Sequence, residues 1–112
     1  MQDFDIISTS QGSLWRLRPQ GEIDIDARPA VHRALGGRPA TAHDLDIDMA
    51  DVSFMDVVGL QLMAHVDTDA RSHGLGVTFR GWQRQPRYLL AVAGDFIRVG
   101  AALHSPFTRD AA

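Results

Sequence analysis

The sequence has no cysteine, no lysine and no long apolar run. Without cysteine, the chain cannot form disulfides, a thiolate nucleophile, iron–sulfur clusters or cysteine-based zinc sites. All 11 basic residues are arginine, which excludes lysine Schiff-base chemistry and lysine acylation. No apolar stretch approaches the roughly 18 residues of a membrane span, and residues 1–5, MQDFD, are acidic where a signal peptide would be basic. We therefore expect a cytoplasmic protein with no membrane span.

The remaining composition is that of one folded domain with an acidic balance. Apolar residues make up 45% of the 112 residues and charged residues 22%, which is typical of globular proteins. We expect a single domain spanning 1–112, with its core at about 4–99 and an irregular C-terminal tail at 100–112. The net charge of −3 argues against binding to nucleic acid. Proteins or small molecules are the expected partners.

The first third of the chain predicts two strands and a helix. Runs 4–9 and 13–18 are rich in Ile, Leu, Trp and Thr and flank a Gln-Gly turn, which is the pattern of a β-hairpin. Asp26 is a suitable N-cap for a helix that has a proline in its first turn. The glycines at 36–37 end that helix.

The middle of the chain predicts two more strands and a longer helix. From Asp44, aspartates alternate with apolar residues, as in a strand with one covered and one solvated face. A short apolar strand follows at 52–55, and Asp56 can cap a helix that ends at Gly74. The apolar stripe of this helix comprises Val58, Leu62, Met63, Val66 and Ala70, and its polar positions are Gln61, His65, Thr68 and Arg71.

The last third predicts a strand at 77–79, a loop at 81–85, a helix beginning at Pro86 and a short strand at 96–99. Helices that separate consecutive strands imply right-handed crossovers on a mostly parallel sheet. We therefore predict an α/β fold, with a mixed, mostly parallel sheet of four to five strands and helices packed against it.

The sequence lacks the motifs of an enzyme or a metal site. The aspartates that alternate from Asp44 resemble a calcium loop, but the glycine and glutamate that such a loop needs would fall on Met49 and Met55. The five histidines form no HExxH motif and no i, i+4 pair. Neither a nucleophile elbow nor a phosphate-binding glycine loop is present. We expect no catalytic activity, no cofactor and no bound metal.

Residues 80–88, RGWQRQPRY, interleave arginines with aromatic residues. Such a pattern suits stacking on a nucleotide or docking on an acidic protein surface. Isolated surface aromatics are ordinary, however. We interpret the segment as a solvated loop with one aromatic side chain packed against the sheet.

The segment 51–60, DVSFMDVVGL, has the most specific pattern in the chain. A buried strand ends at an aspartate and leads into a helix, whose N-terminus presents free backbone N–H groups and the positive end of the dipole. With Gly-Glu-Ile-Asp at 21–24 and the later helix at 86–90, it resembles the STAS domain, the fold of bacterial anti-sigma factor antagonists. The family turn F-[IM]-D-S-[ST]-G-L corresponds to residues 54–60, FMDVVGL. The resemblance covers about residues 4–99.

The resemblance implies a regulatory protein that binds an anti-sigma factor, commonly a serine kinase of the GHKL class, and so frees a sigma factor for transcription. In such antagonists, phosphorylation of the Ser or Thr two residues after the turn aspartate prevents binding. That position is Val58 here, and Val57 is equally unable to accept phosphate. The resemblance therefore predicts binding without phosphorylation control at this site.

The candidate partner-binding patch lies around this turn and on the exposed side of the helix that follows. It comprises Asp24, Asp56, Val57, Val58, Gly59, Leu60 and Gln61, with Val58 at the phosphosite-equivalent position. Two other interpretations stay open. The chain could be an accessory or scaffold STAS subunit of a stress-signalling or lipid-transport assembly, or a sensor that binds a nucleotide.

Overall fold

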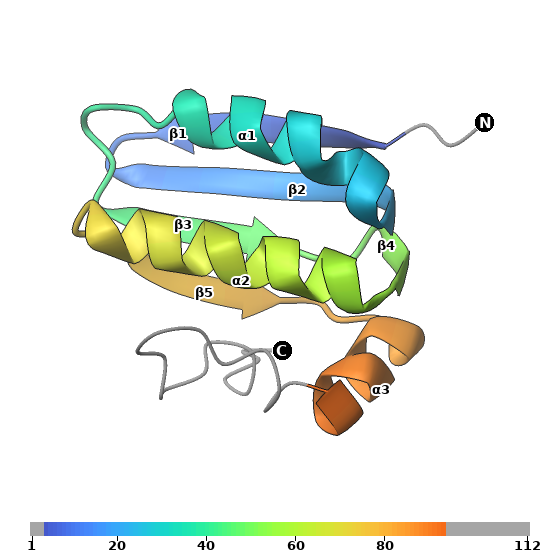
Figure 1. Cartoon of the computed structure of the whole chain (residues 1–112). Helices are drawn as coiled ribbons and strands as arrows, with labels where there is room; N and C mark the ends of the chain where they lie inside the picture. The colour runs from blue at the N-terminus through green and yellow to red at the C-terminus, as the bar shows by residue number, and fades with distance from the viewer. Residues whose placement is uncertain (1–3, 94–112) are drawn as a thin grey trace.

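In the computed structural model, which describes residues 4–93, five strands form a sheet that α1 and α2 cover on one face (Figure 1). In chain order the elements are β1 (Asp5–Gln11), β2 (Leu14–Ile23), the 3₁₀ helix η1 (Ile25–Ala27), α1 (Arg28–Gly36), β3 (Asp44–Asp48), β4 (Val52–Met55), α2 (Val57–Ser72), β5 (Gly76–Arg80) and α3 (Arg84–Ala93). The strand order is β1-β2-β3-β5, and β4 pairs with β2. Only β1 and β2 pair antiparallel among these strands, so the predicted mixed, mostly parallel sheet is confirmed.

The predicted opening hairpin is confirmed. β1 and β2 pair in continuous register, from Asp5 opposite Gln20 to Gln11 opposite Leu14. Gly12 lies between them with a φ of 62°, a conformation in which a side chain would be strained. β2 continues further than predicted and pairs with β3 along its first half and with β4 along its second half. It is therefore the strand that joins the main sheet to β4.

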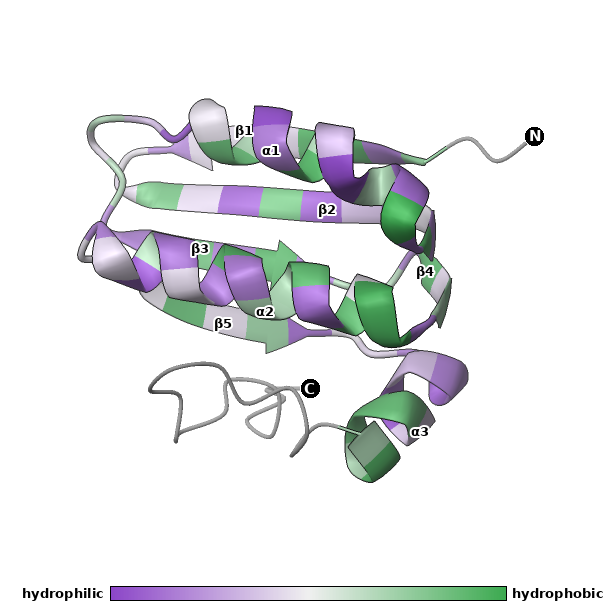
Figure 2. Cartoon of the chain, viewed as in Figure 1, coloured by the Kyte–Doolittle hydropathy of each residue, from purple (hydrophilic) through white to green (hydrophobic). Residues whose placement is uncertain are grey.

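The apolar core lies between the sheet and the helices. Trp15 and Leu17 of β2, Leu45 and Ile47 of β3 and Phe79 of β5 are each at most 2% exposed. These residues alternate along their strands and pair across them, so they point to one face. Figure 2 shows the corresponding division on α2, where apolar residues alternate with polar ones around the helix. The predicted helix stripe is buried as expected, except for its first member, which is half-buried.

The other face of the sheet holds a network of paired charges. Asp46 lies between two arginines, because Arg16 Nε donates to its Oδ2 at 2.8 Å and Arg80 Nε to its Oδ1 at 3.0 Å. Arg18 pairs with Asp51 at 3.0 Å. We call this network the charged sheet face; its members are Arg16, Arg18, Asp46, Asp48, Asp51 and Arg80.

Asp46 corrects the expectation of a solvated row of aspartates on β3. It is 8% exposed, whereas Asp44 at the beginning of the strand is exposed. A buried carboxylate is costly unless opposite charges and hydrogen bonds compensate it, and the flanking guanidinium groups do so here. The alternation along β3 was predicted correctly, but the side chains of neighbouring strands cover its middle aspartate.

The predicted N-cap is wrong for the first helix and correct for the second. In the first, Asp24 is the cap and its Oδ1 accepts from the N–H of Asp26 at 2.9 Å. The predicted cap at Asp26 is wrong, because a turn of 3₁₀ helix precedes α1 and begins two residues earlier. In the second, Asp56 caps α2 as predicted.

The segment after β5 is shorter and more ordered than predicted. α3 begins at Arg84, two residues before the predicted start at Pro86, so only residues 81–83 of the predicted loop lie outside a helix. Trp82 is 4% exposed and stacks on Phe79 with ring centroids 5.8 Å apart. The expected packing of one aromatic against the sheet is therefore confirmed. The predicted strand at 96–99 and tail at 100–112 lie outside the described residues.

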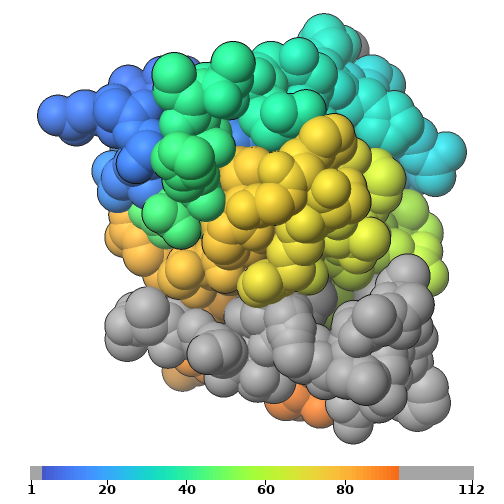
Figure 3. All heavy atoms as spheres, turned by 90° about the vertical axis from the view of Figure 1, so that its left-hand side faces the viewer, coloured from blue at the N-terminus to red at the C-terminus, as the bar shows by residue number. Residues whose placement is uncertain are grey.

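The two ends of the sheet are built differently. The end that faces the viewer in Figure 3 has the β1–β2 turn, the segment between α1 and β3 and the last turn of α2. At the other end, β2 and β4 finish side by side and lead into η1 and α2. In parallel α/β sheets, ligands bind outside the carboxyl ends of the strands. The candidate site therefore lies at this second end.

Candidate functional site

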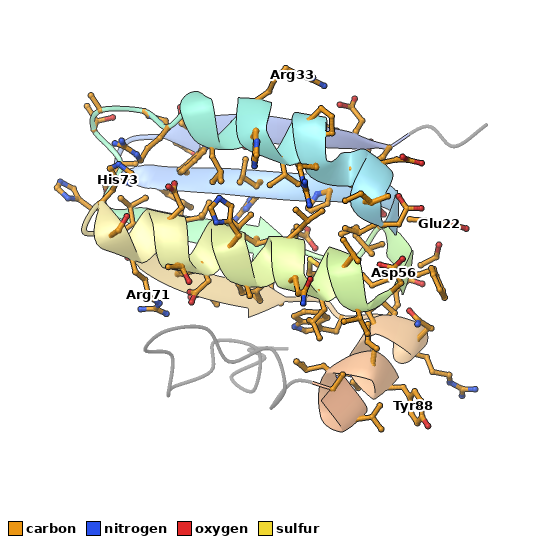
Figure 4. The ribbon with its side chains drawn as sticks, in the orientation of Figure 1. Glu22, Arg33, Asp56, Arg71, His73 and Tyr88 are labelled. Carbon is orange, nitrogen blue, oxygen red and sulfur yellow. The ribbon has the colours of Figure 1, made fainter. Side chains whose placement is uncertain are left out.

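The candidate site begins where β4 leads into α2. Asp56 Oδ1 accepts from the N–H of Gly59 at 2.8 Å, and the backbone N–H of Asp56 donates to the carbonyl oxygen of Ile23 at 3.3 Å. The first bond caps the helix, and the second ties the turn to the end of β2. The Asp56 side chain is thus engaged within the protein and fixes the direction of the first helical turn. Figure 4 shows Asp56 and Glu22 at this end of the molecule.

Gly59 allows α2 to pass close to β2. A Cβ at this position would collide with the carbonyl oxygen of Ile23. The φ of Gly59 is not in the left-handed region, so the position requires space and not an unusual backbone conformation. The glycine of the turn motif therefore keeps the beginning of α2 against the sheet.

Val57 and Val58, which we call the valine pair, lie in the first turn of α2. Val57 is 45% exposed and Val58 is half-buried. Both therefore present apolar surface at a helix N-terminus, where the N–H groups and the dipole would favour an anion. Neither side chain has a hydroxyl, so neither can accept a phosphate.

Two exposed apolar side chains at the same end were not predicted. Ile25 is 48% exposed and Phe54 is 42% exposed. A β-bulge explains Phe54, because the pairing of β4 with β2 shifts between Gly21 and Glu22 and leaves one extra residue on β4. Simple alternation from Val52 would have turned Phe54 inward. The bulge depends on pairing between distant strands, so the local sequence did not indicate it.

Gln85 of α3 holds β4 from the side away from β2. Its Nε2 donates to the carbonyl oxygen of Met55 at 2.9 Å, and its Oε1 accepts from the N–H of Met55 at 2.8 Å. The two bonds replace the pairing that a further strand would provide. Met55 immediately precedes the cap residue of α2, so Gln85 is a positioning residue for the turn. No motif marks it, and 30 residues separate it from Met55.

The structure brings the residues of the predicted patch to one end of the domain, but they differ in how exposed they are. Its exposed members are Val57 and Gln61, its half-buried members Asp24, Asp56 and Val58, and its buried members Gly59 and Leu60. Leu60 is 0% exposed, so it supports the site from inside and offers no surface to a partner. Asp24 and Asp56 both cap helices, so their carboxylates are engaged with the backbone. Exposed Val57, with half-buried Val58 beside it, is the apolar centre of the patch.

Within residues 4–93, no group of three or more His, Asp or Glu side chains is placed to hold a metal ion. In the same part of the chain, no helix has the length and apolar character that a bilayer crossing requires.

The chain matches one protein family over most of its length. That family is described as "Mlab, STAS domain", and the match covers residues 9–95. The protein therefore belongs to this STAS domain family, and the resemblance inferred from the turn motif is confirmed. No curated protein matches the chain.

Solved structures share the fold at low sequence identity. An anti-sigma factor antagonist from Mycobacterium paratuberculosis is 23% identical with a TM-score of 0.66, and the match covers 82% of this chain and 79% of that one. The antagonist SpoIIAA, a Bacillus cell fate determinant, is 17% identical in its unphosphorylated form, with a TM-score of 0.61 and coverage of 82% and 81%. The murine anion transporter Slc26a9 is 15% identical with a TM-score of 0.66, and the match covers 86% of this chain but 19% of the transporter. These likenesses establish the fold.

Proposed function

We propose that this STAS domain is a regulatory protein-binding module that acts on an anti-sigma factor without a phosphorylation switch. The observation on which the proposal rests is the valine pair, which presents neutral apolar surface at the position of the antagonists' phosphoacceptor. Fold similarity to two anti-sigma factor antagonists supports the class of partner. The domain would act in the bacterial cytoplasm, on a partner such as a serine kinase of the GHKL class, and would not itself be an enzyme.

The chemistry of the turn fits a permanently binding-competent state. A phosphate would bring nearly two negative charges and three acceptor oxygens to the N-terminus of α2. The helix N–H groups would tolerate that charge, but a partner fitted to a neutral side chain would be repelled. Val58 keeps the uncharged form whatever kinase is present, so binding is governed by the concentrations of the two proteins.

The exposed apolar residues around the turn give such a partner a surface to bury. Val57, Ile25 and Phe54 come from three different elements and are each more than 40% exposed. A few apolar side chains at the centre of an interface commonly provide most of its binding energy. Gly59 and Gln85 hold the turn against the sheet, so this surface is organised before the partner arrives.

The match to the murine anion transporter favours a second candidate function. The STAS fold corresponds there to 19% of a larger transport protein. This chain would then be an accessory STAS subunit of a membrane transport assembly, such as a lipid-transport machine. A transporter operon around the gene would favour this function, whereas a neighbouring gene for a sigma factor or a GHKL kinase would favour the first.

A charged substitution in the valine pair tests the proposal. The native chain, Val58→Asp and the control Thr68→Asp would each be used to capture proteins from native lysate for mass spectrometry. Thr68 is exposed on the same helix, roughly 15 Å further along its axis, so the control adds the same charge away from the turn. We expect Val58→Asp to reduce capture of the anti-sigma factor on the order of 30-fold or more, and the control to behave like the native chain.

Undiminished capture by Val58→Asp, with both variants folded by circular dichroism, would contradict a role for the turn. Capture of a transport subunit in place of an anti-sigma factor would establish the second function instead. Val58→Ser extends the experiment to the switch itself. If the partner is a kinase, this variant should lose capture in ATP, while the native chain stays bound.

A further inference from the structure

A groove lies between α1 and α2, directly beside the valine pair. It has a volume of about 290 Å³ and is lined by Arg28, His32, Val58, Gln61, Leu62 and His65. Val58 and Leu62 supply its apolar wall, and the other four residues supply nitrogen donors. We call it the helix groove. Because Val58 belongs to both, the groove is continuous with the turn.

The polar side chains of the helix groove are left without hydrogen-bonding or charged partners among residues 4–93. Arg28, His32, Gln61 and His65 make no side-chain hydrogen bond or ion pair within that part of the chain. No carboxylate is among the six lining residues. The charged sheet face is the opposite case, since each of its arginines is paired with an aspartate.

The two histidines come from different helices and meet in the groove. The ring centroids of His32 and His65 are 5.8 Å apart, and the ring planes are inclined by 61° in an edge-to-face contact. Each ring carries a nitrogen that can donate a hydrogen bond, and Arg28 adds a permanently charged guanidinium to the same groove.

We propose that the helix groove binds a carboxylate side chain on an acidic segment of the partner protein. The guanidinium of Arg28 matches a carboxylate in a bidentate geometry, and the histidines and Gln61 can donate further hydrogen bonds. The absence of any lining carboxylate makes the groove complementary in charge to such a segment. The small apolar wall suits the methylene groups of a glutamate.

This inference rests on the proposed function and specifies its partner. The valine pair provides the apolar contact, and the helix groove next to it fixes the orientation of the bound segment. The partner should therefore present an apolar side chain with an acidic residue close to it. Charged contacts at an exposed rim mainly set orientation and association rate, so most of the affinity stays with the apolar contact.

The groove can be tested without the partner. The full chain, labelled with ¹⁵N, would be titrated with an acetylated oligoglutamate peptide, and with oligoglutamine of the same length as the control. We expect oligoglutamate to shift the amide signals of Arg28, of residues 30–32 and of residues 58–65, which include every lining residue of the groove. Oligoglutamine should produce no comparable shifts.

Matched substitutions show whether the lining residues cause the binding. Arg28→Gln and His65→Gln should each weaken oligoglutamate binding by about threefold, as expected for an exposed charge pair. Arg33→Gln is the control, because Arg33 lies on α1 and points away from α2 (Figure 4). It removes the same charge from the same helix and should leave the binding unchanged.

Three results would overturn the proposal. Arg33→Gln could weaken oligoglutamate binding as much as the groove substitutions do, or oligoglutamine could shift the amide signals as much as oligoglutamate does. The third is that oligoglutamate shifts the amide signals around arginines outside the groove as strongly as those within it. An effect of inorganic phosphate without any effect of oligoglutamate would likewise replace the proposed occupant with a small anion. None of these outcomes affects the capture experiment with Val58→Asp. The groove and the proposed function can therefore fail separately.

Discussion

The two charged regions of this domain have opposite characters. On the charged sheet face, Asp46 accepts hydrogen bonds from two arginines and is 8% exposed, so the charges satisfy one another. At the end of the domain where α2 begins, exposed apolar side chains lie beside a groove whose polar residues make no side-chain hydrogen bond or ion pair among residues 4–93. Charge by itself therefore does not mark a binding surface on this domain. The turn and the helix groove are suited to recognising a partner, whereas the charged sheet face stabilises the fold.

We expect substitutions in the two regions to have different consequences. Changes to the charged sheet face should lower the free energy of unfolding and leave partner binding intact. Changes to the exposed members of the turn should weaken partner binding and leave the free energy of unfolding nearly unchanged. Substitutions of the residues that hold the turn from inside should lower both the free energy of unfolding and the affinity for the partner.

Gly59→Ala should have the largest effect on stability. The new Cβ would collide with the backbone carbonyl of Ile23, which cannot move without disturbing β2. We expect the free energy of unfolding to fall by about 3 kcal/mol, the upper end of overpacking effects. Urea denaturation would measure this, with Gly36→Ala as the control because a Cβ at Gly36 meets no atom within 4 Å. Equal effects of the two substitutions would contradict the close approach of α2 to β2.

Asp46→Ala should cause the next largest loss in the free energy of unfolding. It leaves Arg16 and Arg80 without their shared carboxylate, and removal of one partner from a buried pair is strongly destabilising. The side chains of the two arginines are 43% and 36% exposed, so solvent reduces the loss to about 2 kcal/mol. Asp44→Ala on the same strand is the control, since Asp44 is exposed. A loss no greater than that of the control would show that the charged sheet face does not stabilise the fold.

Asp56→Ala should have the smallest of these effects, because it removes one helix cap. Loss of the hydrogen bond to the N–H of Gly59 should cost about 1 kcal/mol in the free energy of unfolding. Asp56→Asn keeps a side-chain oxygen that can accept the same bond, so it should retain most of the stability. If the two variants were equally unstable in urea, the capping role of Asp56 would be refuted.

Local patterns predicted much of this molecule. The hairpin, the alternation along β3 and the cap at Asp56 all follow from short-range rules, and the structure has them in place. The cap of the first helix was misplaced from Asp24 to Asp26 because two aspartates compete for the same role within three residues.

The features that sequence reasoning missed depend on contacts between distant segments. Asp46 is buried because Arg16 and Arg80 lie over it from neighbouring strands. Phe54 turns outward because a bulge interrupts the pairing of β4 with β2, and Gln85 reaches β4 from a helix 30 residues away. The helix groove likewise combines side chains from two helices. None of these could be read from spacing within one element.

The most direct test of the central claim is the affinity of the captured partner for Val57→Asp, measured beside Asp46→Ala. Val57 is 45% exposed, so the aspartate should leave the free energy of unfolding within about 0.5 kcal/mol of the native value. We expect Val57→Asp to lose the partner, whereas folded Asp46→Ala should bind it with native affinity. Native affinity in Val57→Asp would contradict the claim that the valine pair is the docking surface.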